Sequence, residues 1–492
     1  MDTKGKSTVR TTDSRHSLAE RVQTWGASLP ALTPCFFGFA FMRAYNDLVA
    51  RRFSEAPFAA AWTGEDLYSL VLLAVFLVGV LAARRIAPLY RHRDIVVVAV
   101  VLAVIGAVLV GVAPAAGNAL WPCLFCAMAV SGVSGALFIL LWAEFHSCLD
   151  PLGIVIYVSG AFLLGTAGAW ILQDLNGWRE VVVLAVLPFA SVGCLFASFS
   201  RIAPMDLPRS SWGRYDFPWR LIVVLGVYEF AYGVREGAPS FQWDAYPLSV
   251  TLVGAMVFLV AFLGFRRVDF VVVYRSPFAL MICGLVTIPV TAALSPLVSD
   301  VLVSAGYALM FLALTFLLCD LSHRYGVSVL VLCGMQELTA LFRLAGHQVP
   351  QLASSGAVPW LADGTALSAV LTVLVVLAST VLLLGRSSSA PWGATFFGVG
   401  AMARESSGHE ELVRRCAELA QAHGLSSRER EVLDLVAQGR SPSQIERELV
   451  IANGTLKSHM RRIYQKLGIH SKKELLAMVG AGDDAGEGRS SK

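Results

Sequence analysis

The sequence predicts an all-α protein in two parts, a bundle of twelve transmembrane helices arranged six and six and a small C-terminal domain of four helices. Three observations indicate this fold class. Hydrophobic residues make up 56% of the chain and charged residues only 15%, against roughly 25% charged residues in a typical soluble domain. The apolar residues recur in runs of about 20, the length that spans a bilayer as a helix. Residues 425–480 instead alternate short helical patterns with turn residues.

The twelve predicted spans make up a membrane domain at residues 29–385. A helix is expected in each, because every backbone polar group in lipid must find its hydrogen bond within the segment. The seventh and eleventh are shorter or carry charge, and a polar connection at residues 200–218 separates the sixth from the seventh. The spans are residues 29–48, 67–83, 95–113, 120–143, 152–172, 181–199, 219–235, 246–265, 277–294, 301–319, 327–347 and 366–384.

Arginine and lysine are unevenly distributed over the loops between these spans. If the N-terminus lies inside, the inner segments hold 17 of them and the outer loops hold four. Cytoplasmic loops carry the excess of Lys and Arg, so this asymmetry places both termini in the cytoplasm. We expect a multi-pass protein of the plasma (inner) membrane, in contact with the lipid bilayer. The basic tail at residues 1–28 shows no cleavable signal peptide.

The cysteines do not indicate a disulfide framework or a metal site. Most of the nine lie inside apolar runs, where a thiol behaves as a small hydrophobic group. Cys123 and Cys126 form a C-x-x-C pair, but no second pair or nearby His accompanies them. No phosphate-binding loop and no catalytic constellation stand out, so we expect neither enzymatic activity nor a cofactor.

The loop after the second span carries a partial match to a transporter motif. "GVLAARRIAPLYRHR" has Gly79 and Arg84 at motif positions but Ala83 where an Asp is usual. With the two sets of six spans, residues 29–385 resemble the major facilitator superfamily. That resemblance implies a transporter-like bundle. In the family the Asp belongs to a charge network that steadies one state of transport, so its loss argues against transport without removing it as an alternative.

A Gly-, Ser- and Ala-rich linker follows the last span and occupies residues 386–424. Near its end Leu412, Cys416 and Leu419 recur at helical spacing, and Gly424 is a stop signal. We interpret this segment as a lead helix that packs on the next domain, in preference to a dimerising coiled coil. Residues 481–492, at the other side of that domain, are expected to be a disordered tail.

Turn residues divide residues 425–480 into four helices. Ser427 can cap the first helix and Gly439 can end it. Pro442 starts the second, a third runs from Asn453 to a stop at Gly468, and Ser471 begins the fourth. The apolar positions expected to form the core are Val432, Leu433, Val436, Ala437, Ile445, Leu449, Leu456, Met460, Ile463, Leu467, Leu475 and Leu476.

The third of these helices is strongly basic. Lys457, Arg461, Arg462 and Lys466 lie along it, and no acidic residue occurs between Asn453 and Gly468. Two short helices across a tight turn, of which the second is basic, form a helix-turn-helix that can place side chains in the major groove of DNA. A merely solvated basic face is the less favoured interpretation, because helix lengths, turn and charge agree with one motif.

The same segment is similar to the DNA-binding domain of the LuxR (NarL/FixJ) family of bacterial transcription regulators. The residues that carry this resemblance are Leu425, Arg428, Glu429, Val432, Leu433, Gly439, Ile445, Leu449, Thr455, Lys457, His459, Ile463, Lys466 and Leu467. By resemblance, Lys457, Ser458 and Arg461 face base edges, whereas Thr455, His459 and Arg462 lie near phosphates. Lys466 is also expected in the DNA-binding surface. The resemblance further implies a homodimer on promoter DNA.

Two positions depart from the family pattern. Glu446 replaces a small residue that lets the two motif helices approach closely, and a salt bridge from it to the recognition helix would offset the crowding. Ala452 replaces the Ser that caps the recognition helix, which costs about 1 kcal/mol unless Asn453 takes over the cap.

The combination indicates a membrane-embedded one-component transcription regulator, with a transporter-like sensor and a cytoplasmic DNA reader. One alternative is a secondary transporter with a C-terminal regulatory DNA-binding tail. Another is a bundle that serves only as an anchor. Uptake measurements separate the first two, and regulation that needs no ligand would favour the third.

Charged groups within the spans are the candidate sensor residues, because intramembrane charges are costly and mark function. Asp47 follows Arg43 by four residues and can neutralise part of its charge, while Gln336, Arg343 and His347 share one face of the eleventh span. We expect one cavity, open to the outside, that binds a small polar ligand, either anionic or aromatic. Pairing that merely holds the bundle together is an equal alternative. The tentative ligand-binding residues are Arg43, Glu229, Tyr232, Glu337, Arg343 and His347.

Overall fold

A computed structural model of the chain describes most of its residues. These are 32–54, 57–59, 62–115, 120–175, 177–202, 207–208, 219–264, 270–291, 295–354, 364–384, 415–437, 445–446, 449, 453–471, 474–475 and 478. The chain divides into two compact units, one of residues 1–212 with 222–384 and one of residues 213–221 with 385–492. The fold is all-α, as predicted, apart from one short hairpin in the first unit.

The first six membrane helices follow the first six predicted spans in order. Asp150 and Pro151 fix the start of the fifth, because the Asp150 carboxylate accepts a hydrogen bond from the backbone N–H of Gly153 and proline suits the first helical turn. A short 3-10 turn, η1 (Pro34–Phe37), precedes the first helix. Two more, η2 (Leu89–Arg91) and η3 (Ala113–Ala115), and the antiparallel strands β1 (Pro57–Ala59) and β2 (Trp62–Thr63), lie between the helices. The helices are α2 (Phe39–Ser54), α3 (Gly64–Ile86), α4 (Arg93–Val112), α5 (Leu120–His146), α6 (Pro151–Leu172) and α7 (Trp178–Phe199).

The second set of six spans differs from the prediction at the eleventh, which is not one continuous helix. Its first segment ends at Glu337, where the backbone N–H and the hydroxyl of Thr339 both donate to the carbonyl of Gln336 and tighten the chain. A second break falls at Gln348, two residues before Pro350, which has no N–H to continue the hydrogen bonding of the preceding turn. The elements are α8 (Trp219–Glu236), α9 (Ala245–Gly264), α10 (Phe270–Thr291), α11 (Pro296–Tyr325), the broken span α12 (Val329–Glu337), α13 (Ala340–His347) and α14 (Val349–Ser354), and α15 (Gly364–Leu384).

Eight helices of the described chain are long and apolar enough to cross a membrane, counting the broken span as one. Two shorter apolar stretches, Ser276–Thr291 and Leu367–Ala378, lie within α10 and α15. The remaining two, α2 and α8, carry several charged side chains, which lower their hydropathy. Each predicted span therefore contains helical structure, whereas the number of twelve crossings stays a prediction.

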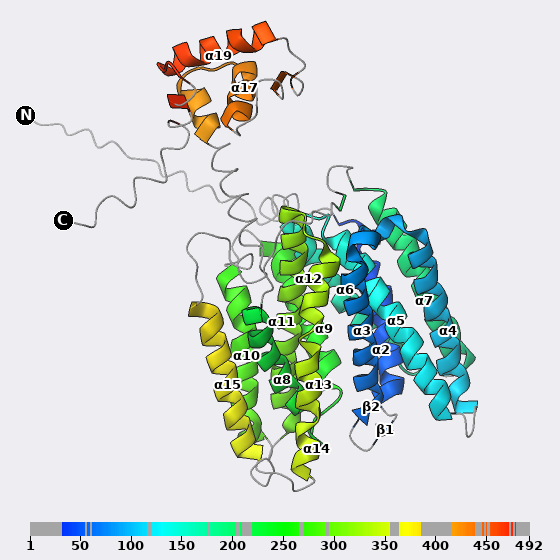
Figure 1. Ribbon diagram of the computed structural model, residues 1–492. Helices are drawn as coiled ribbons and strands as arrows, with labels where there is room; N and C mark the ends of the chain where they lie inside the picture. Colours follow the sequence, from blue (N-terminus) through cyan, green and yellow to red (C-terminus); the bar gives the residue numbers. More distant parts are fainter. Residues whose placement is uncertain are drawn as a thin grey trace, which may run out of the picture. The chain divides into compact units, whose positions relative to one another are not determined.

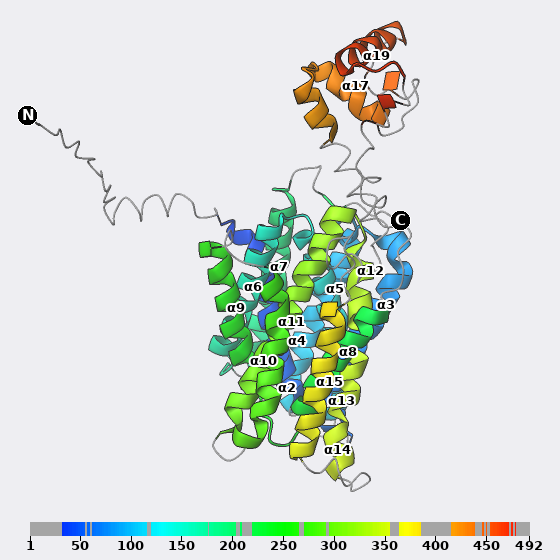
Figure 2. The ribbon, with the colours of Figure 1, turned by 90° about the vertical axis from the view of Figure 1, so that its left-hand side faces the viewer.

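The first unit, which we call the membrane unit because the predicted spans lie in it, consists of two groups of helices, α2–α7 and α8–α15, which lie side by side (Figures 1 and 2). Helices α3, α5 and α6 of the first group pack on α9, α11, α12 and α13 of the second. At the end of the bundle where α5 and α11 terminate, the ring nitrogen Nδ1 of His323 lies 3.0 Å from the backbone carbonyl oxygen of Ser147. The predicted division six and six is thus the main structural division of this unit.

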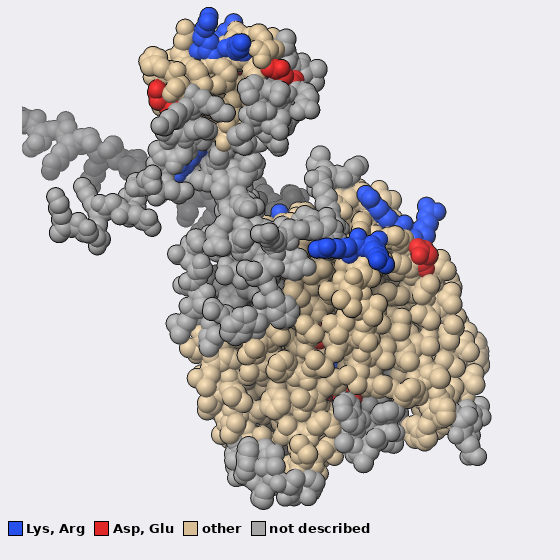
Figure 3. Space-filling view, in the orientation of Figure 1, with Lys and Arg blue, Asp and Glu red and all other residues tan. Residues whose placement is uncertain are grey.

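The sides of the membrane unit are apolar. Helix α4 buries small residues such as Ala99 and Ala103 and exposes a stripe of larger ones, namely Val97, Val98, Val101, Ile105, Val108 and Val112. Over the visible face, uncharged surface covers the middle of the unit and arginines gather towards one end (Figure 3). An uncharged belt of this kind is the surface that a bilayer core accepts.

The connection between α3 and α4 is held by a carboxylate from another helix. The Glu144 side chain of α5 accepts the backbone N–H groups of Leu89 and Tyr90, each at 2.8 Å. Ala83, at the position where the transporter motif has Asp, is fully buried. The connection between α3 and α4 is therefore held by Glu144 of α5 and not by an Asp at position 83. The sequence of the connection itself gives no sign of this contact.

The C-terminal unit has a separate core. Helix α17 (Ser427–Ala437) packs on α19 (Asn453–Leu467). Helical residues 415–422 precede them and bury Cys416 in the same cluster. These residues lie in the segment expected to form a lead helix. The buried residues are Cys416, Val432, Leu433, Leu435, Val436, Ala437, Ile445, Leu456, Ile463, Leu467, Ile469 and Leu475; Leu476 lies outside the described residues.

Most of the predicted helix signals in this unit are found, but one is displaced. Gly424 and Gly468 have positive φ angles of 59° and 70°, as expected of glycines that end helices. The cap of α17 is Ser426 and not Ser427. The Ser426 hydroxyl accepts the N–H of Glu429 at 3.3 Å, while the Glu429 carboxylate accepts the N–H of Ser426 at 2.8 Å. This reciprocal capping box selects the serine three residues before the acid.

Candidate functional site

Helix α19 presents one buried and one exposed side. Leu456, Ile463 and Leu467 are buried against the rest of the domain. They are seven and four residues apart, which places them on a single face of a helix. The opposite side lies at the surface, where lysine and arginine side chains cluster (Figure 3). The sequence thus anchors the helix by an apolar stripe and leaves its basic side available.

Six of the seven predicted DNA-binding residues lie exposed on this helix, namely Thr455, Lys457, Ser458, Arg461, Arg462 and Lys466. Lys457 and Arg461 are one turn apart, so their side chains project from neighbouring points of the same face. His459 is partly buried, and its Nδ1 atom is buried without a hydrogen-bond partner among the described residues. The exposed groups form a basic surface of the kind that enters a groove of DNA.

Lys466, the last of the seven predicted residues, makes a tertiary contact. Its Nζ atom lies 2.7 Å from the Glu429 carboxylate and donates at 2.8 Å to the carbonyl of Gly424. Hydrogen bonds from Lys466 and from the Ser426 backbone lower the pKa of Glu429 to about 2. Lys466 therefore joins α19 to the start of α17.

Two further contacts position the middle of the motif. The Arg428 guanidinium donates to the backbone carbonyl of Leu449 at 2.5 Å. The Asn453 side-chain amide donates to the Glu446 carboxylate. Glu446, which replaces a small residue of the family pattern, thus contacts the recognition helix through a hydrogen bond and not through the predicted salt bridge. Ala452 lies outside the described residues.

The membrane unit contains a cavity of about 710 Å³ between its two groups of helices. Its mouth lies at the C-terminal ends of α2 and α6, where the side chains of Arg51 and Asp244 are 48% and 88% exposed. Its closed end is lined by Trp142 and Cys319, which are 0% and 1% exposed. A volume of this size suits a small organic molecule.

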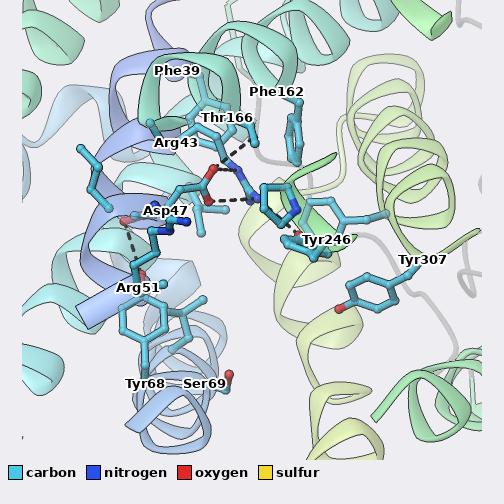
Figure 4. A pocket seen from close by; sticks show the side chains of 18 of the residues that line it. Phe39, Arg43, Asp47, Arg51, Tyr68, Ser69, Phe162, Thr166, Tyr246 and Tyr307 are labelled. Carbon is cyan, nitrogen blue, oxygen red and sulfur yellow. Dashed lines mark hydrogen bonds and ion pairs between the residues drawn. The ribbon is translucent and has the colours of Figure 1, made fainter. Parts of the chain in front are cut away.

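Arg43 lies at the centre of one wall, with its charge matched (Figure 4). Its guanidinium is 3.1 Å from the Asp47 carboxylate, which also accepts the Thr166 hydroxyl at 3.0 Å. The same guanidinium lies 4.9 Å from the Phe162 ring centroid and donates to the Tyr246 hydroxyl at 3.3 Å. The predicted neutralisation of Arg43 by Asp47 is therefore confirmed, with aromatic rings as additional partners.

Two predicted residues of α13 make contacts across the bundle. Arg343 pairs with Glu236 of α8 at 3.1 Å and donates to the Ser69 hydroxyl of α3 at 2.5 Å. The His347 ring nitrogen lies 2.9 Å from the Asp66 carboxylate of α3. The contacts with Ser69 and Asp66 join the two groups of helices, and Arg343 alone of the two residues lines the cavity.

A group of tyrosines forms another part of the wall. The rings of Tyr232 and Tyr307 stack with centroids 3.9 Å apart and planes 8° from parallel. Tyr246 lies about their edges, with centroids 6.5 Å and 6.3 Å away. Figure 4 shows Tyr246 and Tyr307 from separate elements directed towards the same space. Glu229 interacts with the Tyr307 hydroxyl, and its Oε2 atom is buried with no hydrogen-bond partner in the described chain.

Four of the six tentative ligand residues line this one cavity, namely Arg43, Tyr232, Glu337 and Arg343. Glu229 and His347 are not among its described lining residues. The sequence reading missed Tyr246, Tyr307 and Phe162, because an aromatic residue in an apolar span has the appearance of a core residue. It also missed Glu236 and Asp66, which lie at helix ends where a charge is ordinary.

Comparison with known proteins identifies the C-terminal unit. Residues 423–479 match the family described as "Bacterial regulatory proteins, luxR family". "Probable transcriptional regulatory protein NarL" of Mycobacterium tuberculosis (strain CDC 1551 / Oshkosh) is 42% identical over 67 residues, which are 14% of this chain and 30% of that protein. "HTH-type transcriptional regulator MalT" of Vibrio campbellii is 44% identical over 59 residues, which are 12% of this chain and 6% of that protein.

A second MalT, that of Vibrio cholerae serotype O1, is 46% identical over 57 residues, or 12% of this chain and 6% of its own length. The chain thus spans less than a third of the length of these relatives. The likeness lies in the part that contains α17 and α19. The chain accordingly carries a LuxR-type helix-turn-helix domain at its C-terminal end, preceded by a region of apolar helices.

Proposed function

We propose that this chain, which carries a LuxR-type helix-turn-helix domain behind a set of apolar helices, is a membrane-embedded one-component transcription regulator. The observation that carries the proposal is the presence on one chain of at least eight helices that can cross a membrane and an exposed basic recognition helix. The α19 surface binds promoter DNA, and the membrane unit senses a small-molecule ligand in its cavity. No enzymatic step is part of this function.

An inner-membrane location with cytoplasmic termini is part of the proposal. The asymmetry of arginine and lysine between the inner and outer loops supports it. Of the four arginines assigned to outer loops, Arg52 pairs with Glu180 at 2.9 Å and Arg235 with Asp300 at 2.6 Å. Arg51 lies 3.7 Å from Asp244. Three of the few arginines on that side therefore take part in ion pairs.

The proposed link between ligand and DNA is a shift between two arrangements of the six-helix groups. A ligand that prefers one arrangement shifts the population towards it, and the segment at residues 386–424 passes the change to the DNA-binding domain. The cavity supports this idea because its walls come from both groups: Arg43 lies on α2, whereas Tyr246 and Arg343 lie on α9 and α13. We propose the homodimer on DNA by resemblance to the family.

Promoter capture with membrane fractionation tests the proposal. Tagged full-length protein should be found in the membrane fraction and should enrich a small set of promoters, and the Lys457→Ala/Arg461→Ala variant should be equally abundant but enrich none. Membrane-localised protein that enriches no promoter would show the proposal to be wrong. Substrate uptake by vesicles containing the protein would instead support the secondary transporter with a regulatory DNA-binding tail.

A further inference from the structure

The charges that line the cavity do not balance. Its described lining residues include four arginines and five acidic residues. Each arginine has a carboxylate partner: Arg43–Asp47, Arg51–Asp244, Arg52–Glu180 and Arg343–Glu236, with distances of 3.1, 3.7, 2.9 and 3.1 Å. The acid left over is Glu337, which forms no ion pair or hydrogen bond within the described part of the chain.

The excess is concentrated around one guanidinium. Arg343 is hydrogen-bonded to Glu236 and lies close enough to interact electrostatically with both Glu229 and Glu337. Three carboxylates therefore share a single fixed positive charge at this point. Glu229 has a buried oxygen without a hydrogen-bond partner, as already noted. Such an excess of desolvated carboxylates is costly unless a positive charge or a proton accompanies it.

The position of Glu337 on its helix adds to this cost. It is the last residue of α12, at the break before α13. The C-terminal end of a helix carries a partial negative charge from its unpaired carbonyl groups, so cations are stabilised there and carboxylates are not. A cation close to Glu337 would interact favourably with the carboxylate and with the helix end together.

The part of the cavity wall next to Glu337 is aromatic. Tyr68 lies near enough to Glu337 for an electrostatic interaction, and the stacked Tyr232 and Tyr307 rings lie on the side of Glu229. Ring faces attract cations and accept the apolar part of an organic molecule. Arg43, set against Phe162 and Tyr246 in the same cavity, already shows this interaction with a protein cation.

We propose that the ligand of this cavity is an organic monocation, with an ammonium or guanidinium group near Glu337 and an aromatic or aliphatic body against the tyrosines. The charge count disfavours the anionic ligand that the arginines alone suggest, because each of those arginines is already matched. The inference rests on the proposed function only in taking this cavity as the site of the sensed ligand.

Thermal unfolding of the purified full-length protein in detergent tests the inference. The probes are phenethylammonium and benzyltrimethylammonium, with 2-phenylethanol and phenylacetate as neutral and anionic counterparts of similar size. The cations should raise the unfolding temperature in a saturable manner and the counterparts should not. Glu337→Gln should weaken the apparent affinity for the cations at least tenfold, whereas Asp150→Asn, an exposed cap residue outside the cavity, should leave it unchanged.

Several results would overturn the inference. These are stabilisation by 2-phenylethanol or phenylacetate as strong as by the cations, stabilisation by sodium ions or by acidification alone, and no effect of any probe on a protein that unfolds cooperatively. Equal binding by wild type and Glu337→Gln would also contradict it. Since no DNA is present in this measurement, failure of cation binding and failure of promoter recognition are separate outcomes.

Discussion

Glu429 and Lys466 form an ion pair of 2.7 Å that joins the first turn of α17 to the last turn of α19. The Glu429 side chain is 4% exposed, and it also closes the capping box with Ser426. One carboxylate thus fixes the start of one helix and the end of the recognition helix. Lys466 belongs to the family pattern, and the structure gives it a role in holding α19 in place.

Loss of either partner should destabilise the C-terminal domain. Hydrogen bonds to charged groups contribute about 1.5–3 kcal/mol, and the lower end applies because Lys466 is partly exposed. Lys466→Ala should therefore reduce the free energy of unfolding of a fragment of residues 409–480 by about 1–2 kcal/mol in urea denaturation. Glu431→Gln, a change of an exposed acid on α17, should change it by less than about 0.5 kcal/mol.

The same pair should make the stability of this fragment sensitive to acid. The pKa of Glu429 is lowered from 4.5 to about 2 in the folded domain, so its contribution is fully present above pH 4.5. It should be lost as the pH falls from 4.5 towards 2, because protonation is easier in the unfolded chain. Denaturation curves for the wild type and Glu429→Gln should converge over this range, and a constant difference between them would contradict the pairing.

Base-reading and phosphate-binding residues of α19 should be separable by their effects on DNA affinity. A good base contact contributes about 1–3 kcal/mol of discrimination, so Lys457→Ala and Arg461→Ala should lose preference for the cognate site more than general affinity. Arg462→Ala should weaken binding to all sequences and flatten its salt dependence. Fluorescence anisotropy at several salt concentrations would measure this, with Arg430→Ala on α17 as the charge-matched control. If both Lys457→Ala and Arg461→Ala kept the preference for the cognate site, these two residues would not contact its bases.

The parts of the structure that could be predicted are those governed by local pattern. The length of the apolar runs predicted the helices of the first unit. Gly424 and Gly468 correctly marked the ends of the helices that they follow. The cap was misplaced by one residue, because Ser426 and Ser427 are equivalent until the acid three residues later is considered. Local signals thus determine elements to within a residue or two.

The parts that could not be predicted depend on contacts between distant segments. Asp66 and His347 are far apart in the sequence, and neither suggests the other until α3 and α13 pack together. The break after Glu337 is likewise invisible in an apolar run, so the expected common face of Gln336, Arg343 and His347 assumed a continuous helix that is absent. Charge balance in the cavity emerges only when such pairs are known.

Topology can be tested at the last residue. A cytoplasmic-only reporter fused after Lys492 should be active, and a reporter that works only outside the membrane should be silent, because the 17-to-four loop asymmetry places the C-terminus inside. A second pair of fusions after Arg235, on the opposite side, should give the reverse pattern. The opposite result at Lys492 would overturn both the orientation and DNA binding by the intact protein.

Arg43 and Asp47 offer a test of whether a buried pair serves structure or sensing. Removing one partner leaves an uncompensated charge, which costs about 3–5 kcal/mol at a buried site. Arg43→Gln and Asp47→Asn should each lower the amount of protein in the membrane, and the neutral double variant should restore it. If the double variant accumulates but responds weakly to ligand in a promoter reporter, the pair also contributes to binding. Full accumulation of both single variants would show that the pair is not structural.

The contact between Asp66 and His347 should influence the balance between the two arrangements of the bundle. It joins α3 of one group to α13 of the other at 2.9 Å, next to the link from Arg343 to Ser69, so any relative movement of the groups at this end must break it. Asp66→Asn and His347→Gln should each favour the arrangement in which α3 and α13 are not in contact at this end. Both variants should therefore change the promoter activity measured without ligand, and in the same direction. Thr372→Val, which removes a hydroxyl bonded within its own helix, should leave that activity unchanged. Reporter assays at equal protein levels would measure the shift, and unchanged activity in both variants would show that the contact does not take part in switching.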